Sequence, residues 1–465
     1  MSLQIIMEPE SAGQLVLGNE YYHPGIAYKP GDSVLIKIVP ESPYQFTGWT
    51  GDVSDDHMAD VPLKLAITEE NQVITANFKK NPEHSKELVF DSAFENGNGI
   101  LRYYDRDSRR LVVEPQQINL ANNIWWHFKI HNITPGEFLH LDIDNWEIAG
   151  DCQPVFSYDG KNWQRMTGVK SPYIQRFEAA SVEIARNIPY TFSHSLALVD
   201  ELVSPYVQPQ ILAISEGGRQ VKTMRITDPQ VADDQKRIIW VMARLHAFES
   251  HSSILAEGLA RWLTTDNDEA RAILKRFIVY ITPIMDVDNV VLGGSGKEQL
   301  TWDRQRVDFN RQWGDTSHWA AVRAAKQLLE ELQKTHDIAA FIDLHDPWFS
   351  GDGHWDPPAK FETQIREFSQ TFIKILEQSV TNARWKFEII VWKGKGQGIE
   401  PTLDPTLQTS TSYASSRLFP EAEGHLCFVM EIPHWTDGYG NPITIRGLSA
   451  YGEALGRALG DYLNG

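Results

Sequence analysis

From residue 209 to the end of the chain, near-continuous apolar runs of strand length alternate with segments of helical period. This alternation limits the possible folds more than any other feature of the sequence. Continuous apolar runs predict strands buried on both faces, and the amphipathic segments between them predict the helices that cover those faces. The expected strands are IIWVMARL, RFIVYITPIMDV, IAAFIDLH, KFEIIVW and HLCFVMEIP, and the expected helices are SSILAEGLARWLTT, WAAVRAAKQLLEELQKT and LSAYGEALGRALGDYL. The segment therefore predicts an α/β domain with a mixed, mainly parallel sheet covered by helices.

The sequence before this segment has a different pattern of apolar and turn-forming residues. Short β-type runs such as SVLIKIV and VITANF alternate with turn clusters such as KPGDS, and no helical period appears in the first 80 residues. Such spacing is typical of all-β modules. We therefore predict a multi-domain chain with a small β module over 1–82, a second β domain over 86–205 and the α/β domain over 206–465.

Charge and composition exclude several classes of function. The formal net charge of -19 opposes binding to nucleic acids or anionic membranes, because the field of the whole protein repels polyanions. No stretch reaches the ~18 apolar residues that a membrane span needs. The N-terminus has no signal-peptide pattern, so the compartment stays open between the cytoplasm and secretion with a removed signal. The oligomeric state also stays open.

Polar side chains follow several of the predicted strands, which is where open α/β sheets bind their ligands. His246 and Glu249 follow the first strand, His345 ends the third, and Glu431 lies in the last, within FVMEIP. Two histidines and a glutamate form a ligand set that holds zinc and leaves a fourth position open for water. Asp343, two residues before His345 on the same strand face, is a candidate partner for the second nitrogen of that imidazole.

The order of these motifs, HxxE, then Asn-Arg in VDFNRQW, then a later histidine and a final glutamate, resembles the zinc metallocarboxypeptidase family. The resemblance extends upstream, because VFDSAFENGNGI, WWHFKIHN and PVFSYDGKNW look like the β-sandwich of the cytosolic carboxypeptidase subfamily. The stretch YQFTGWTGD, followed by ITANF, resembles the bacterial internalin-type β-repeat.

The resemblance implies a hydrolase that cleaves a C-terminal peptide or amide bond with a zinc-activated water. The implied ligands of one Zn²⁺ per chain are His246, Glu249 and His345. Glu431 would be the general base, since a carboxylate in an apolar strand is costly to bury unless it is used or paired. Asn310 and Arg311 would hold the free C-terminal carboxylate of a peptide or peptide-like substrate, Arg311 through two parallel hydrogen bonds. The alternative is that Arg311 pairs with Asp308 or Asp315 at the surface.

Two further roles rest on weaker positions. The family uses a cation to hold the oxyanion, and Lys297, Arg304 and Arg306 are the candidates; spacing does not select among them, and we favour Arg304. The family also has a tyrosine that closes over the substrate, and Tyr413 is the best candidate for it.

The chain departs from the family between the first two ligands, where Ala247 and Phe248 replace the Pro-Gly of many members. We expect this bulk to narrow the pocket or to change the leaving-group site. KGKGQG (393–398) is either a basic lid or a solvated loop. Two alternatives for the function remain: a zinc-dependent N-acyl amino-acid deacylase, and a carboxypeptidase-like binding protein with weak catalysis.

Overall fold

The computed structural model describes most of the chain. The described residues are 3–9, 12–16, 29–31, 33–40, 44–58, 63–68, 70–80, 88–106, 108–118, 124–136, 138–144, 152–296, 299–300, 306–346, 353–378, 388–389, 408–436 and 441–464. No helix among them is long and apolar enough to cross a membrane.

An eight-stranded sheet forms the centre of the C-terminal half, with the order β16-β17-β19-β18-β22-β25-β23-β24. Its strands are β16 (Val207–Ile214), β17 (Gln220–Ile226), β18 (Arg237–Ala243), β19 (Phe277–Thr282), β22 (Ile338–His345), β23 (His354–Asp356), β24 (Glu388–Ile389) and β25 (Leu426–Glu431). The pairs from β19 through β18 and β22 to β25 are parallel, and so is the pair of β23 with β24. The pairs of β16 with β17, β17 with β19 and β23 with β25 are antiparallel. The prediction of a mixed sheet is confirmed.

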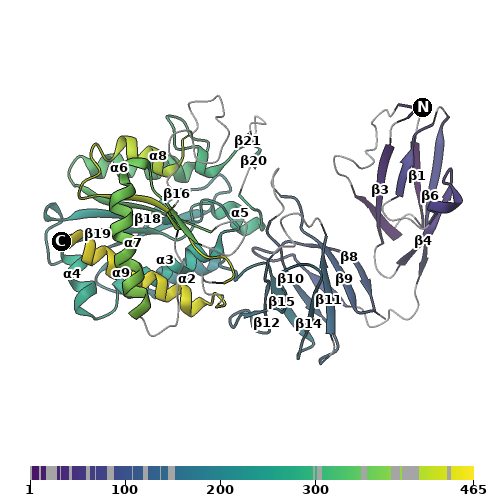
Figure 1. Cartoon of the computed structure of the whole chain (residues 1–465), viewed down its shortest axis with the longest axis horizontal. Coiled ribbons are helices and arrows are strands. Elements are labelled where there is room, and N and C mark those ends of the chain that lie inside the picture. The colour runs from purple at the N-terminus through teal and green to yellow at the C-terminus, as the bar shows by residue number, and fades with distance from the viewer. Residues whose placement is uncertain are drawn as a thin grey trace.

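Helices pack around this sheet (Figure 1). They are α2 (Phe192–Glu201), α3 (Ser250–Leu263), α4 (Asp268–Arg276), α5 (Val287–Leu292), α6 (Ala320–Gln333), α7 (Glu362–Gln378), α8 (Ser410–Arg417) and α9 (Ile445–Asn464). The predicted helices correspond to α3, α6 and α9. Glycines allow α3 and α9 to approach closely, because a Cβ on Gly258 would lie 2.6 Å from the backbone of Ser449.

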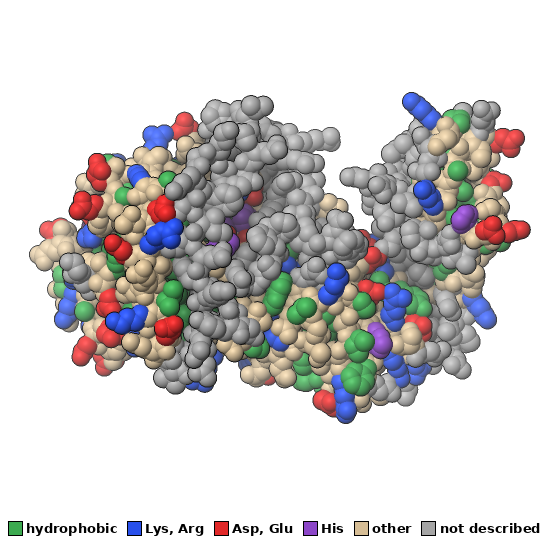
Figure 2. Space-filling view, in the orientation of Figure 1, with side chains coloured by type: hydrophobic (Ala, Val, Ile, Leu, Met, Phe, Trp, Pro, Cys, Tyr) green, Lys and Arg blue, Asp and Glu red, His purple; other side chains and the backbone are tan. Residues whose placement is uncertain are grey.

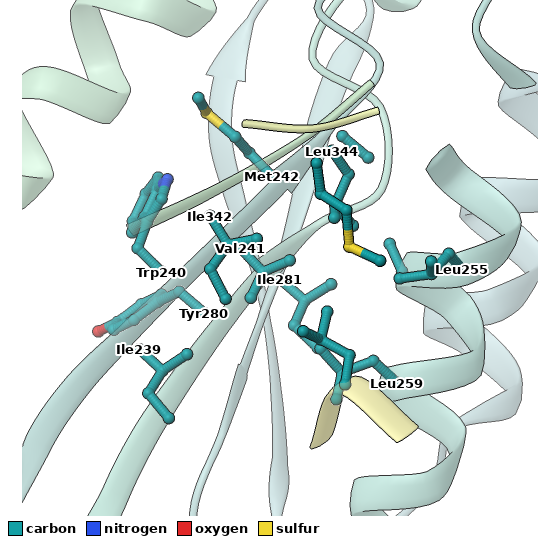
Figure 3. Close-up of a cluster of buried hydrophobic side chains, with 14 of the residues drawn as sticks. Ile239, Trp240, Val241, Met242, Leu255, Leu259, Tyr280, Ile281, Ile342 and Leu344 are labelled. Atoms are coloured by element: carbon teal, nitrogen blue, oxygen red, sulfur yellow. The ribbon is translucent and has the colours of Figure 1, made fainter. Parts of the chain in front are cut away.

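The core of this domain lies between the central strands and α3. Figure 3 shows Val241, Ile281 and Ile342 on neighbouring strands, with Leu255 and Leu259 of α3 beside them. All of these side chains are at most 1% exposed. Strands buried in this way have no need of polar alternation, which accounts for their continuous apolar runs.

A β-sandwich precedes the α/β domain. Its sheets have the orders β13-β12-β15-β10-β7 and β14-β11-β9-β8. The strands are β7 (Val89–Asp91), β8 (Ile100–Asp105), β9 (Arg110–Glu114), β10 (His127–His131), β11 (Phe138–Ile143), β12 (Val155–Ser157), β13 (Gln164–Arg165), β14 (Tyr173–Arg176) and β15 (Ser181–Ala185). The helix α2, which lies before the predicted boundary at 205, packs with β17 and α5 of the α/β domain.

The N-terminal module consists of two three-stranded sheets, β1-β6-β4 and β2-β3-β5. Its strands are β1 (Leu3–Glu8), β2 (Gly13–Val16), β3 (Ser33–Pro40), β4 (Tyr44–Gly51), β5 (Leu63–Ala66) and β6 (Gln72–Lys80). Trp49, Leu63 and Ile74 lie in a core of its own. In Figure 1 the sandwich stands between this module and the α/β domain.

Candidate metal centre

Two neighbouring parallel strands, β18 and β22, bring the three predicted zinc ligands together. The ligand atoms of His246, Glu249 and His345 all lie within 4.8 Å of one another. His246 Nδ1 is 2.7 Å from Glu249 Oε1, and His345 Nδ1 is 2.7 Å from Glu249 Oε2. All three residues are buried. The ends of the two strands thus place two imidazole nitrogens around one carboxylate.

The other nitrogen of each imidazole faces a carboxylate. His246 Nε2 forms a 3.0 Å hydrogen bond with Asp308 Oδ1, and His345 Nε2 lies 3.0 Å from Asp343 Oδ2. The hydroxyl of Ser410 donates a hydrogen bond to the same oxygen of Asp343. Such partners orient an imidazole and make its free nitrogen a better metal ligand.

The loop that carries His246 and Glu249 is held from inside by Arg244. This arginine has a positive φ of 65°, a conformation that is uncommon for a residue with a side chain. Its buried guanidinium donates from Nε to the carbonyl of Ala247 at 2.7 Å and from Nη1 to the carbonyl of Tyr190 at 2.9 Å. These hydrogen bonds compensate for the unusual backbone and fix the turn between strand and helix.

Two further hydrogen bonds connect this loop to the end of β22, the strand that carries His345. Asp346, the next residue after that ligand, accepts the backbone N–H of His251 at 2.8 Å and of Ser252 at 2.9 Å. These N–H groups belong to the first turn of α3, where a helix has no internal acceptors and favours negative charge. Asp346 therefore connects the start of α3, directly after Glu249, to the end of β22.

Opposing effects set the charge of the cluster. Burial alone would raise the pKa of the Glu249 carboxyl, but His246 and His345 bring it below the ordinary value. Burial likewise lowers the pKa of His345, yet the negative charges of Asp343 and Glu249 raise it well above the ordinary value. The buried carboxylates thus favour a positive charge among them.

The donor set fits zinc. Two imidazole nitrogens and a carboxylate oxygen are preferred zinc ligands, and three of them leave a position for water or substrate. Glu249 Oε2 is buried without a hydrogen-bond partner in the described part of the chain, although His345 Nδ1 is close to it. A shared cation would satisfy this oxygen and both nitrogens.

Glu431 lies directly beside this cluster. It pairs with His345 in the parallel register of β22 and β25, and the N–H of Ile432 donates to the carbonyl of His345 at 2.8 Å. Burial raises the pKa of the Glu431 carboxyl above its ordinary value, and the charge of Glu249 adds to this effect. A carboxylate with a raised pKa is a better proton acceptor near neutral pH.

Asn310 and Arg311 lie at the edge of the cluster, in a short 3₁₀ turn (Phe309–Arg311). Asn310 Nδ2 is 3.3 Å from His345 Nε2, and its Oδ1 accepts the N–H of Ser410 at 3.0 Å. Arg311 Nη1 donates to the carbonyl of Asn310 at 3.1 Å. The alternative partners of Arg311 are engaged elsewhere among the described residues, Asp308 with His246 and Asp315 with Arg417.

The bulk of Phe248 lies elsewhere than predicted. Its side chain is fully buried in a separate cluster with Ile124 and Trp125 of the sandwich region. The expectation that Phe248 narrows the pocket is therefore wrong, because the ring occupies the joint between the sandwich and the ligand loop. His246 instead contacts Glu249, and the centre of its ring is 6.5 Å from that of Phe248.

The remaining predicted residues are less favourably placed or lie outside the described residues. Tyr413 is 2% exposed, and its hydroxyl donates to Glu330 at 3.1 Å. These contacts do not support a residue that closes over substrate, and the role stays a prediction. Lys297, Arg304 and KGKGQG lie outside the described residues, while Arg306 begins the short strand β21 (Arg306–Val307).

Sequence reasoning missed the positioning roles of Asp308, Arg244 and Asp346. The pattern contained a signal for Asp308, which stands two residues before Asn310 in VDFNRQW. We interpreted it only as a surface partner of Arg311, since a sequence does not show which strand ends meet. The side chains of Arg244 and Asp346 contact backbone atoms of other residues, and the sequence pattern carries no signal for such contacts.

Comparison with known proteins gives two family matches. Residues 195–345 match the zinc carboxypeptidase family, peptidase M14, and residues 21–82 match the divergent InlB B-repeat domain. The first match begins in α2 and ends at His345. The second match covers most of the N-terminal module.

Curated relatives point in the same direction. The chain is 24% identical over 413 residues to cytosolic carboxypeptidase 6 of Caenorhabditis elegans, covering 80% of this chain and 86% of the relative. It is 25% identical over 291 residues to cytosolic carboxypeptidase 6 of Mus musculus, covering 56% of this chain. That alignment spans 53% of the mouse protein, about half of its length.

Solved structures share the fold. A metallo-carboxypeptidase from Burkholderia cenocepacia superimposes with a TM-score of 0.66 at 18% identity, over 81% of this chain and 99% of the other. A metallo-carboxypeptidase from Pseudomonas aeruginosa, solved in complex with (2-guanidinoethylmercapto)succinic acid, gives a TM-score of 0.65 at 20% identity, over 81% of this chain and 100% of the other. At these identities the likeness shows the architecture of sandwich and α/β domain together.

Proposed function

We propose that this chain, a hydrolase with a zinc carboxypeptidase domain, removes the C-terminal residue of a peptide or peptide-like substrate. The observation that carries the proposal is the convergence of His246, Glu249 and His345, with Glu431 in register beside His345. Metal ligands and a candidate base thus meet at the carboxyl ends of adjacent strands, where such sheets bind ligands.

His246, Glu249 and His345 would hold one zinc ion, which supplies Lewis acidity that lowers the pKa of a water molecule and polarises a carbonyl group. Glu431 would take a proton from the attacking water and return it to the leaving amine. Its raised pKa, caused first by burial, favours the first of these transfers, because it makes the carboxylate a better proton acceptor. Asp308 and Asp343 would keep the two imidazoles oriented throughout.

Arg311 and Asn310 would hold the substrate's C-terminal carboxylate. The geometry that supports Arg311 is its place directly after Asn310, which lies 3.3 Å from His345 Nε2, together with the contacts of Asp308 and Asp315 with other residues. A carboxylate bound there would place the scissile carbonyl about one residue from the chain end. Arg304 remains our candidate for the cation that stabilises the oxyanion.

Metal analysis tests the first part of the proposal. We expect one tightly bound zinc per chain in the purified protein, and loss of that zinc in His345→Ala. His131→Ala, which removes a histidine of the sandwich, is the matched control and should keep its zinc. A protein without zinc, or unchanged zinc in His345→Ala, would overturn the site assignment.

Activity assays test the second part. Peptides ending in Glu, Lys or Phe are compared with N-acyl amino acids; preferred cleavage of the latter would make the protein a deacylase instead. We expect Glu431→Gln to keep zinc and to lose hydrolysis about 100-fold or more. Undetectable hydrolysis of a broad peptide library by the zinc-loaded protein would reduce the function to binding.

A ligand tests the anchor. We propose that (2-guanidinoethylmercapto)succinic acid, which the Pseudomonas aeruginosa metallo-carboxypeptidase binds, also binds this chain through a carboxylate on Arg311. Arg311→Ala should then weaken binding about 10- to 100-fold, the usual effect of losing a hydrogen-bonded charge. Arg323→Ala, which removes an exposed arginine of α6, is the control, and we expect it to bind the compound as tightly as the wild type does.

A further inference from the structure

We propose that His354, Asp356 and Glu431 form a second divalent-cation site directly beside the zinc cluster. Each of the three residues offers one ligand atom, and these atoms all lie within 4.8 Å of one another. His354 Nε2 is 3.5 Å from Asp356 Oδ2, a separation that leaves room for an ion to be shared. One imidazole and two carboxylates suit zinc and related divalent transition metals.

The sheet itself aligns these residues. Glu431 on β25 pairs with His345 on β22 on one side and with His354 on β23 on the other. Paired residues of adjacent strands present their side chains on the same face, about 4.8 Å apart from strand to strand. His345, Glu431 and His354 therefore form one row, and Glu431 lies between the two candidate metal sites.

The strand β23 is anchored so that its polar residues face this row. Trp355 points to the opposite face, where its ring packs on Phe428 at 4.5 Å and on Phe368 at 5.4 Å. Because side chains alternate along a strand, His354 and Asp356 must then share the other face. The sequence HWD thus fixes a histidine and an aspartate two residues apart beside Glu431.

Unsatisfied oxygen atoms are the second observation that points to a cation. Asp356 Oδ1 and Glu431 Oε2 are buried and have no hydrogen-bond partner in the described part of the chain. Neither carboxylate forms an ion pair with a lysine or an arginine of that part. Asp356 is only 9% exposed, and a buried carboxylate oxygen without a partner is costly. A cation between the three residues would satisfy both oxygens.

The two sites differ in how strongly they should bind. The side chains of the first ligand set are 5%, 2% and 2% exposed, whereas those of His354 and Asp356 are 15% and 12% exposed. Water competes better for the more exposed ligands, so the second site fills after the first.

Occupancy of the second site has a consequence for hydrolysis. Glu431 cannot accept a proton with an oxygen lone pair that a cation already holds. Excess metal should therefore inhibit the enzyme through this site. This consequence rests on the proposed role of Glu431 as general base, whereas the binding site itself does not.

Metal stoichiometry tests the site without reference to activity. The folded protein is dialysed against increasing Zn²⁺, and bound metal is measured per chain. We expect two zinc ions in the wild type and in His131→Ala, and one in His354→Ala and in Asp356→Asn, with circular dichroism to confirm that each variant is folded. Saturation of the wild type at one zinc, or binding of two by both variants, would overturn the proposal.

Inhibition by excess zinc tests the consequence. Hydrolysis by the wild type should fall as the second zinc binds. His354→Ala should need about 10- to 100-fold more zinc for the same inhibition. Losing a residue that only hydrogen-bonds to a metal ligand already costs this much affinity, and losing a ligand costs at least as much. Equal inhibition of both proteins would overturn the inhibitory role. If two zinc ions bind but no peptide is cleaved at any zinc concentration, the proposed function fails and the second site stands.

Discussion

Two β modules precede the α/β domain, and they differ in how they are joined to it. The sandwich contributes Val155 and Ala185 to the main core of the α/β domain, and its region contributes Ile124 and Trp125 to the cluster around Phe248. The N-terminal module has a separate core, and its strand β3 contacts β8 of the sandwich.

This difference in contacts indicates which of the two modules supports the candidate metal centre. Phe248 lies between the proposed zinc ligands His246 and Glu249, so the sandwich region supports the ligand loop through the cluster around Phe248. Asn98 of the sandwich adds a hydrogen bond from Nδ2 to the carbonyl of Gly293 at 2.7 Å, directly after α5. The N-terminal module reaches neither point among the described residues.

The largest effect is expected from Trp125→Ala. Trp125 is 1% exposed, its Nε1 donates to the carbonyl of Asn96 at 2.9 Å, and its ring lies in the cluster with Phe248. Loss of such a ring typically costs about 3–5 kcal/mol of unfolding free energy. We expect this loss in denaturant unfolding, together with weaker zinc binding in a chelator competition.

Trp49→Ala is the matched control for that experiment. Trp49 is equally buried, but it lies in the core of the N-terminal module. Its removal should destabilise that module and leave zinc affinity unchanged. If Trp125→Ala bound zinc as tightly as the wild type does, the sandwich would support the fold but not the ligand loop.

The sequence predicted the elements of this region better than the contacts between them. Continuous apolar runs identified the central strands correctly, because burial on both faces leaves a direct mark on composition. The convergence of the three candidate metal ligands at the strand ends followed from that arrangement, whereas their roles came from the family resemblance. Phe248 was misinterpreted, since a sequence does not show that the sandwich reaches this loop, and β23 was not predicted because three residues carry too little periodicity.

A smaller effect is expected from Asn98→Ala. Asn98 is 3% exposed, and besides Gly293 it accepts the N–H of Gln116 on Oδ1 at 2.7 Å. Leaving such buried groups unpaired costs about 1–3 kcal/mol. Thermal unfolding should show this loss in the transition of the sandwich and the α/β domain. Asn77→Ala, which removes comparable hydrogen bonds in the N-terminal module, should leave that transition unchanged.

The joint also contains a pH-dependent group, Asp286, which caps α5. Burial raises its pKa from 3.8 to about 7, against hydrogen bonds from Asn289 that lower it. The folded state therefore binds more protons than the unfolded state between these two values, and its stability falls as pH rises through that window. Each unit by which the pKa differs between the folded and the unfolded state corresponds to about 1.4 kcal/mol of unfolding free energy.

Asp286→Asn should remove this dependence in the zinc-free protein. The melting temperature of the variant relative to the wild type is expected to be higher at pH 8 than at pH 5. Asp55→Asn, a substitution in the N-terminal module, is the control. Its melting temperature should differ from that of the wild type by the same amount at pH 5 and at pH 8. A variant that loses the same stability at every pH would show that Asp286 acts only as a helix cap.

The smallest effect on the enzyme is expected from deletion of residues 1–82, which include the match to the divergent InlB B-repeat domain. Because Trp49, Leu63 and Ile74 lie in a core of their own, the deletion removes no side chain from the core of the sandwich or of the α/β domain. Calorimetry should lose the module's own transition and keep the main one, with unchanged zinc content and unchanged kcat/KM on short peptides. A fall in kcat/KM would show that the contact of β3 with β8 reaches the active site through the sandwich, and the two modules would then differ in degree rather than in kind.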